Sequence, residues 1–261
     1  MAVAEPARVR VVIAALLAAL LGAVSVVSGA PVAEAGTEPE PLAGRTIVLD
    51  AGHQLGNANF PAQINRPVPA GGFTKPCNTT GTATNGGYPE ATFNFAVASA
   101  LRDRLTDAGA TVVMVRKTNR ADLWGPCIDV RGRAGNAIDA DLKISIHADG
   151  SYVAGARGFH VIAPVSRAGW TADIAEDSRQ LALDVRAGLE SAGLPRANYI
   201  AGGDGLDFRS DLGTLNLSDV PTVMVEAGNM RNADEAGRMS TASGRSVYVN
   251  GLLRGVLRYL D

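Results

Sequence analysis

Two of the three histidines in this chain lie at the ends of short β-branched or aliphatic runs. His53 follows the run that begins at Thr46, and His147 follows residues 142–146. In an open parallel sheet, ligands bind just beyond the carboxyl ends of the strands. Two imidazoles at that edge, with carboxylates nearby, therefore predict a metal site. The candidate carboxylates are Glu90 and Glu226, with Asp50 and Asp149 in reserve.

The chemistry of such a set is that of a metal hydrolase. A catalytic zinc ion typically takes three protein ligands and leaves a fourth position open, and two histidines with one carboxylate are a common set. A further carboxylate, near the metal but not bound to it, moves the proton of the attacking water. Spacing alone leaves structural interpretations open. Each histidine can be a hydrogen-bonded structural residue, Glu90 a helix-terminal carboxylate and Glu226 a salt-bridge partner at the sheet rim.

Strand and helix patterns alternate along the chain, which predicts a single α/β domain with a mostly parallel sheet flanked by helices. We expect strands at 46–50, 111–115, 142–146, 158–162 and 221–226, and helices at 89–108, 131–140, 173–192 and 247–260. Residues 54–87 are rich in Gly, Pro, Asn and Thr and show no sustained period. They form a long connection that starts at His53, and connections of this length are usually functional or mobile.

Four segments stand out in order along the chain. They are Ile47-Val-Leu-Asp-Ala-Gly-His53, Glu90 with Asn94, residues 133–148 ending in Ser145-Ile-His-Ala148, and Val223-Met-Val-Glu-Ala-Gly-Asn229. In order and approximate spacing, from about residue 45 to 260, they resemble the zinc-dependent N-acetylmuramoyl-L-alanine amidases of the amidase-3 type, in a secreted, actinobacterial form. The resemblance implies a six-stranded mixed sheet, zinc bound by His53, Glu90 and His147, and Glu226 as the catalytic carboxylate.

The resemblance also implies the substrate. The family hydrolyses the amide between the lactyl group of N-acetylmuramic acid and L-alanine of the stem peptide, so the partners are peptidoglycan and muramyl peptides. Arg209 and Asn229 are candidate substrate-binding residues. An arginine can hold a stem-peptide carboxylate in a bidentate fork, although a plain surface arginine is the alternative. His160 lies inside an expected strand and is either structural or substrate-facing.

The N-terminal region has the layout of a secretory signal peptide. Arg8 and Arg10 precede an apolar run over residues 11–27, and Ala33-Glu-Ala35 follows. We expect residues 1–35 to be a signal peptide, 36–44 a flexible leader and 45–261 the catalytic domain. An uncleaved anchor is the alternative, because the run is at the lower edge of a membrane span. The mature protein is then an exported monomer of the periplasm, the cell wall or the medium, without membrane contact.

The chain has two cysteines, Cys77 and Cys127. In an oxidising compartment an even number of cysteines predicts a disulfide. Metal ligation is the alternative, but neither cysteine lies in a C-x-x-C pair or near a histidine. The bridge would tie the long connection to the segment before residue 131 and fix an active-site wall or partial lid.

The charge balance gives no indication of nucleic-acid binding. There are 24 basic and 26 acidic residues, for a net charge of −2, whereas binding phosphates needs a basic patch. Two other functions stay open at this point. One is another zinc-dependent cell-wall peptidase, such as a D,D- or L,D-carboxypeptidase. The other is a catalytically silent wall-binding or regulatory module, which would have no need of two histidines and two glutamates.

Overall fold

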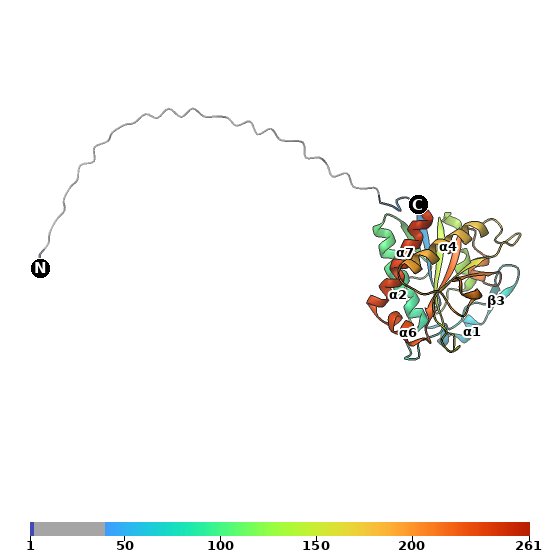
Figure 1. Cartoon of the computed structure of the whole chain (residues 1–261), viewed down its shortest axis with the longest axis horizontal. Coiled ribbons are helices and arrows are strands. Elements are labelled where there is room, and N and C mark those ends of the chain that lie inside the picture. The colour runs from blue at the N-terminus through green and yellow to red at the C-terminus, as the bar shows by residue number, and fades with distance from the viewer. Residues whose placement is uncertain (3–39) are drawn as a thin grey trace, which may run out of the picture. The chain divides into compact units, whose positions relative to one another are not determined.

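The computed structural model describes residues 1–2 and 40–261 (Figure 1). The expected signal peptide falls almost wholly outside these residues, as does the leader up to residue 39. The packed chain begins slightly before Arg45, because Leu42 is 1% exposed and its N–H donates to Ala108 O at 2.8 Å. The last residues of the expected leader are therefore part of the fold. In the described part of the chain, no helix has the length and apolar character needed to cross a membrane.

A six-stranded sheet forms the centre of the fold, in the order β4-β1-β5-β8-β6-β7. Strands β4, β1, β5 and β8 are parallel, β6 is antiparallel to β8, and β7 is parallel to β6. This confirms the expected α/β fold with a mostly parallel, mixed sheet. The strands are β1 (Thr46–Ala51), β4 (Thr111–Met114), β5 (Leu142–Asp149), β6 (His160–Pro164), β7 (Leu206–Arg209) and β8 (Thr222–Asn229).

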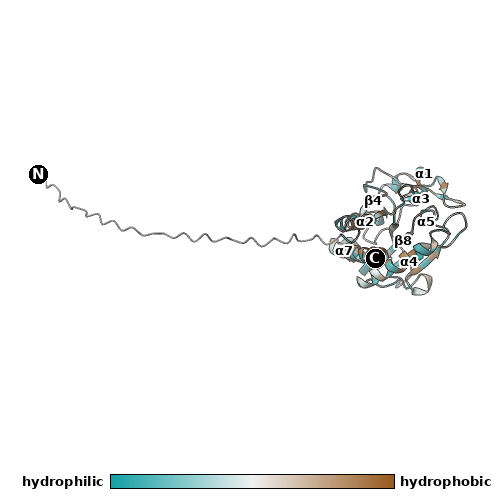
Figure 2. Cartoon of the chain, turned by 90° about the horizontal axis from the view of Figure 1, so that it is seen from above, coloured by the Kyte–Doolittle hydropathy of each residue, from teal (hydrophilic) through white to brown (hydrophobic). Residues whose placement is uncertain are grey.

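The main core lies between one face of the sheet and three long helices, α2 (Glu90–Asp107), α4 (Ala175–Ser191) and α7 (Ala242–Leu260). On α2, apolar side chains recur every four residues from Phe93 to Leu105 and are fully buried, as an amphipathic helix requires. Figure 2 shows α2, α4 and α7 on one side of β8, and α1, α3 and α5 on the other.

The second face of the sheet is covered by short elements. They are η1 (Asn57–Asn59), α1 (Pro61–Ile64), the hairpin β2 (Pro67–Pro69) and β3 (Thr74–Pro76), α3 (Ile128–Arg133), η2 (Asn136–Ile138) and α5 (Gly213–Asn216), while η3 (Ala201–Gly203) and α6 (Ala233–Ser240) complete the fold.

The helix expected over 131–140 is wrong in its bounds. Gly135 adopts a φ of +101°, a conformation that glycine tolerates and a helix does not, and it separates α3 from η2.

Alternation along the strands sorts apolar from polar side chains. In β5 the aliphatic residues face the main core, whereas Lys143, Ser145 and His147 face the other side. In β8, Met224 and Glu226 likewise lie outside the main core cluster. The second face therefore carries the polar residues, and we call it the polar face.

Candidate active site

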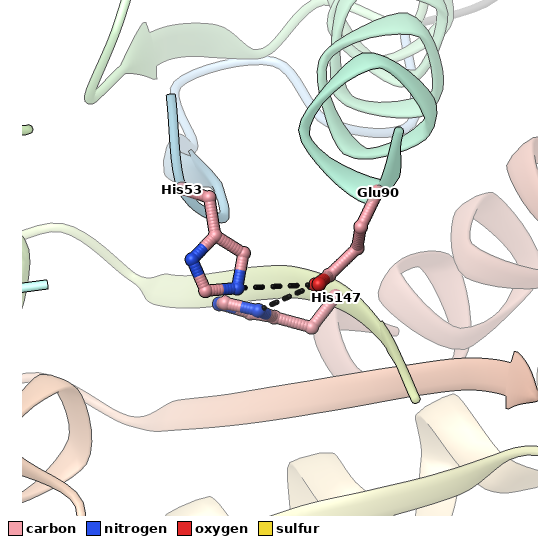
Figure 3. Close-up of side chains that lie close together, drawn as sticks. All are labelled: His53, Glu90 and His147. Atoms are coloured by element: carbon pink, nitrogen blue, oxygen red, sulfur yellow. Dashed lines mark hydrogen bonds and ion pairs between the residues drawn. The ribbon is translucent and has the colours of Figure 1, made fainter. Parts of the chain in front are cut away.

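Three of the expected metal ligands converge at one point (Figure 3). His53 follows β1, Glu90 is the first residue of α2, and His147 lies in β5. Glu90 Oε1 is 3.3 Å from His53 Nε2 and 3.0 Å from His147 Nδ1, and the three candidate ligand atoms lie within 4.8 Å of one another. Ligands of a tetrahedral ion with bonds of about 2.0–2.1 Å are about 3.3 Å apart. The cluster can hold a metal ion.

The Glu90 carboxylate is fixed from several sides. It is 3% exposed. Thr82 N donates to its Oε2 at 2.8 Å, and Asn94 Nδ2 donates to its Oε1 at 3.1 Å from one turn further along α2. Burial raises the pKa of Glu90, but the imidazoles of His53 and His147 outweigh burial and hold that pKa well below its usual value. The carboxylate is therefore ionised and oriented, as a metal ligand must be.

The two imidazoles differ in their surroundings. Burial lowers the pKa of His53, but the Glu90 carboxylate outweighs it and the pKa is raised overall. For His147, burial prevails over Glu90 and the pKa is lowered. Their ring centroids are 4.8 Å apart with the planes nearly perpendicular, so both rings present an edge to the same small space beside Glu90.

Gly52 makes room for the ring of His147. A Cβ built on Gly52 would lie 2.3 Å from His147 Cε1 and 2.5 Å from Nε2. We expect Gly52→Ala to displace this imidazole, to lower the free energy of unfolding by about 1–3 kcal/mol and to weaken metal binding. Urea unfolding and metal titration check this. Gly237→Ala is the matched control, because a Cβ there meets nothing within 4 Å; equal effects of the two substitutions would contradict the steric explanation.

Glu226 lies next to the cluster in the middle of the sheet. It pairs with His147 across β5 and β8, and with His160 across β8 and β6. These three side chains thus form a transverse row on the polar face. Glu226 Oε2 is buried and accepts no hydrogen bond from the described residues. Burial and the charges of Glu90 and Asp149 raise the pKa of Glu226 well above its usual value, and Arg209 opposes this.

A cavity of about 210 Å³ opens beside His53 and His147 on the polar face. Its walls include Met224 of β8, Leu212 and Thr214 near α5, and Lys75 of β3. The cavity is therefore bounded on one side by the candidate ligands and on the other by the β2–β3 hairpin, which belongs to the long connection after His53.

Arg209, a candidate substrate-binding residue, ends β7 on this face. Its Nε and Nη2 donate to the two carboxylate oxygens of Asp211 at 2.8 and 2.9 Å, and Lys75 Nζ donates to the Asp211 carbonyl and carboxylate at 2.6 and 3.1 Å. The bidentate fork of Arg209 is thus engaged by a residue of the chain itself. A substrate carboxylate would have to compete with Asp211 for it.

Asn229, the other candidate, is 1% exposed. Its Nδ2 donates to Ser151 O and Ala156 O at 3.0 and 2.9 Å, and its Oδ1 accepts from Arg231 N at 3.0 Å. All of its side-chain polar atoms are used by backbone groups, which gives Asn229 a role in holding the loop after β5.

The reserve carboxylates lie outside the cluster. Asp50 forms an ion pair with Arg131 and accepts a hydrogen bond from Ser145 Oγ at 2.8 Å. Asp149 Oδ2 accepts from the Tyr199 hydroxyl at 2.9 Å. His160 is 3% exposed, and its buried Nδ1 has no hydrogen-bond partner in the described part of the chain. Its ring lies edge to face with the ring of Tyr199, and the two ring centroids are 6.5 Å apart.

The expected disulfide between Cys77 and Cys127 is present. Both sulfurs are committed to it, so metal ligation by these cysteines is excluded. The bridge joins the long connection to the segment before α3, as the sequence predicts.

Sequence reasoning missed the residues that hold the ligands in place. Arg131 is 2% exposed and donates to the backbone oxygens of Ala51 and His53 at 2.8 and 2.7 Å. Asn78 and Thr79 hold the ring of His53. The one sequence signal for Asn78 is that it directly follows a cysteine of the disulfide. For Arg131 the signal is a charged residue within a segment typical of the protein interior. Hydrophobic periodicity places such a charged residue on the exposed surface of a helix.

Residues 47–258 match the family described as N-acetylmuramoyl-L-alanine amidase, Amidase_3. The N-acetylmuramoyl-L-alanine amidase Rv3717 of Mycobacterium tuberculosis is 41% identical over 230 residues, which are 88% of this chain and 92% of that protein. The crystal structure of the N-acetylmuramyl-L-alanine amidase Ami1 of Mycobacterium smegmatis has 38% identity and a TM-score of 0.77, over 84% of this chain and 98% of that one. The apo form of Ami1 from Mycobacterium abscessus has 42% identity and a TM-score of 0.77, over 84% and 100%.

Proposed function

Because the chain belongs to the N-acetylmuramoyl-L-alanine amidase family, we propose that it is a zinc-dependent peptidoglycan amidase. It hydrolyses the amide between the lactyl group of N-acetylmuramic acid and L-alanine of the stem peptide. The observation that carries this proposal is the convergence of His53, Glu90 and His147, with Glu226 opposite His147 on the neighbouring strand, beside a cavity that His53 and His147 line.

The donor set favours zinc. Two imidazole nitrogens and one carboxylate oxygen are ligands that zinc prefers, and the separations of 3.0 and 3.3 Å from Glu90 Oε1 agree with tetrahedral spacing. When bound, zinc supplies a Lewis acid that polarises the amide carbonyl and makes the attacking water more acidic. His53, Glu90 and His147 hold it, while Asn94 and Thr82 N orient the Glu90 carboxylate.

Glu226 is the proposed proton shuttle. Its Oε2 is buried, accepts no hydrogen bond from the residues described here, and belongs to a side chain directly opposite His147. A carboxylate so placed takes a proton from the attacking water and delivers it to the alanine nitrogen as the amide bond breaks. Burial is the largest cause that raises the pKa of Glu226, and a carboxylate with a raised pKa is better suited to take up and return a proton near neutral pH.

The substrate also indicates where the protein acts. Peptidoglycan lies outside the cytoplasmic membrane, so we propose that the chain is exported to the periplasm, the cell wall or the medium and acts there as a monomer. The disulfide agrees with an oxidising compartment.

The test is product analysis with controlled metal content. We expect the protein to release a free lactyl carboxyl and an L-alanine amino terminus from muramyl dipeptide, as identified by mass spectrometry. Treatment with a strong chelator should reduce the rate to background, and one equivalent of Zn²⁺ should restore it. Muramyl pentapeptide and tetrapeptide are tested in parallel, because their longer stems offer a carboxypeptidase a C-terminal amino acid to remove. Release of that amino acid would identify a carboxypeptidase instead, and zinc binding without cleavage of any of these substrates would identify a silent module.

A further inference from the structure

The ring of His53 is held by a part of the chain that the catalytic proposal does not use. His53 Nδ1 lies 3.1 Å from Asn78 Oδ1 and 3.1 Å from the carbonyl oxygen of Thr79. Both are oxygen acceptors, so Nδ1 carries the proton and donates to them. The unprotonated nitrogen is then Nε2, which faces Glu90.

The Asn78 amide has only one consistent orientation. Its Nδ2 donates to Pro126 O at 2.7 Å, and its Oδ1 accepts from Thr79 N at 2.8 Å. The side chain is 5% exposed. Exchanging the oxygen and the nitrogen would bring two carbonyl oxygens together and two N–H groups together. The oxygen of Asn78 is therefore fixed toward His53.

The Thr79 carbonyl is fixed in the same way. Asn57 Nδ2 donates to Thr79 O at 2.7 Å, and Asn57 Oδ1 accepts from Gly125 N at 2.9 Å. Asn57 is fully buried. Both acceptors of His53 are thus tied to the segment 125–126 through an asparagine side chain.

The disulfide joins the same two segments. Cys77 directly precedes Asn78, and Cys127 directly follows Pro126. Both cysteines are buried, and Ile128 N also donates to Cys77 O at 2.8 Å. The covalent bridge is thus adjacent in sequence to both ends of the Asn78–Pro126 hydrogen bond.

His53 depends on such external support. Its φ is +56°, a left-handed conformation that is sparsely populated for residues other than glycine and persists where the surroundings hold it. Arg131 Nη2 holds its carbonyl oxygen at 2.7 Å, and Asn78 and Thr79 hold its ring. The backbone and the ring of this ligand are therefore secured by different groups.

We propose that Asn78, secured by the Cys77–Cys127 disulfide, is a positioning residue that sets the tautomer and ring orientation of His53 and so the affinity for the metal. This inference rests on the proposed zinc site. Hydrogen-bond partners of ligating histidines fix which nitrogen is free to bind, and their loss typically lowers metal affinity about 10–100-fold.

The experiment measures Zn²⁺ affinity of the full-length chain by competition with a fluorescent chelator. We expect Asn78→Ala to weaken binding about 10–100-fold. Asn78→Asp should weaken it less, because Asp keeps the acceptor oxygen toward His53 although it loses the donor to Pro126 O. Asn65→Ala is the control, because Asn65 lies in the same connection, is exposed, and its Nδ2 bonds only the backbone oxygen of Pro61. An affinity of Asn78→Ala equal to that of Asn65→Ala would overturn the proposal.

A second readout separates positioning from general stability. Nitrogen-15 NMR of the metal-free protein, recorded at a pH at which the His53 ring is neutral, should show His53 protonated at Nδ1 in the wild type and in Asn78→Asp, and a mixture of tautomers in Asn78→Ala. An unchanged tautomer in Asn78→Ala contradicts the proposal even if that variant is less stable. Should Asn78→Ala not fold, the tautomer and affinity of Asn78→Asp and of the cysteine variant described next decide the matter.

The contribution of the disulfide is tested by combination. Replacing Cys77 and Cys127 with alanine should lower zinc affinity. The triple variant that also carries Asn78→Ala should have the same affinity as Asn78→Ala alone, because both changes act through one contact. Additive losses would show that the bridge acts independently of Asn78. A wild type that binds no zinc would instead refute the proposed function, whereas tight wild-type binding with unaffected variants would refute only this inference.

Discussion

Glu226→Gln is expected to lower kcat/KM for muramyl dipeptide about 10²–10⁴-fold while the bound zinc is retained. Glutamine has nearly the same shape as glutamate but cannot accept and return a proton. The residue lies opposite His147 and beside the cluster rather than in it, so the three ligands should stay in place. Steady-state kinetics and metal analysis of the purified variant measure the two quantities.

The matched control for this prediction is Glu176→Gln. Glu176 lies in the first turn of α4 and is exposed, so the same change in charge and shape should leave both activity and zinc content unchanged. Loss of zinc from Glu226→Gln would make Glu226 a ligand and require another proton shuttle. Full activity with zinc present would remove it from the mechanism.

Arg131→Met is expected to lower the free energy of unfolding by about 3–5 kcal/mol. Arg131 is 2% and Asp50 is 0% exposed, and they form an ion pair. Removing the guanidinium leaves the Asp50 carboxylate buried without its ion-pair partner, although Ser145 Oγ still donates to it. It also removes the donors to Ala51 O and His53 O. Urea unfolding of the metal-free protein at pH 7 measures the effect without a contribution from zinc.

Two further proteins sharpen this test. Arg102→Met breaks the exposed Arg102–Asp103 pair, and we expect a change of at most about 1 kcal/mol. The double variant Asp50→Leu with Arg131→Met should recover part of the loss, because apolar replacement of both partners of a buried pair is often tolerated. If the double variant is less stable than Arg131→Met alone, the buried charge is not the cause of the loss.

The Asp50–Arg131 pair also predicts how the difference in stability between the wild type and Arg131→Met depends on pH. Burial raises the pKa of Asp50, but the charges of Arg131 and His147 and the hydrogen bonds from Ser145 and Arg131 together outweigh it, and the pKa is lowered from 3.8. For a carboxyl whose pKa is depressed in the folded protein, the stabilisation is complete above the unfolded value and is lost as the pH falls through the folded value. In Arg131→Met the burial of Asp50 is no longer offset by Arg131, so the pKa of Asp50 is higher in the folded variant than in the folded wild type. The stability gap between the two proteins should therefore be widest near neutral pH and should narrow as the pH falls from the raised pKa of the variant through the depressed pKa of the wild type.

The cluster of candidate ligands could be predicted because each of its residues depends on one strong local signal. His53 follows an aliphatic strand, His147 directly follows the aliphatic run of β5, and Glu90 begins a helix whose apolar residues recur every four positions. The second strand is longer than expected, because β5 continues through His147 to Asp149. These elements occupy the positions that hydrophobic periodicity predicts. The sheet follows from the same periodicity, apart from β7, a four-residue edge strand in which Asp207 and Arg209 alternate with Leu206 and Phe208.

The support of the ligands could not be predicted in this way. Asn78 reaches His53 because residues 54–77 fold back on themselves through short turns, and nothing periodic in that segment fixes the path. Arg131 is buried because five oxygen atoms, from Asp50, Ala51, His53, Gly125 and Pro126, surround its guanidinium. Four of those oxygens belong to the backbone, and backbone oxygens leave no mark on the sequence.

The reversal of strand direction between β8 and β6 has a consequence for how this protein can diversify. Because β6 is antiparallel to β8, it begins at the edge where β5 ends. Residues 150–159 therefore cross the end of β8, beside Glu226, and Asn229 fastens them through Ser151 and Ala156. Tyr152 and Val153 within this crossing are 80% and 65% exposed. Substitutions or insertions at these two positions can reshape the surface around Asn229 while the register of the strands and the candidate ligand cluster stay the same.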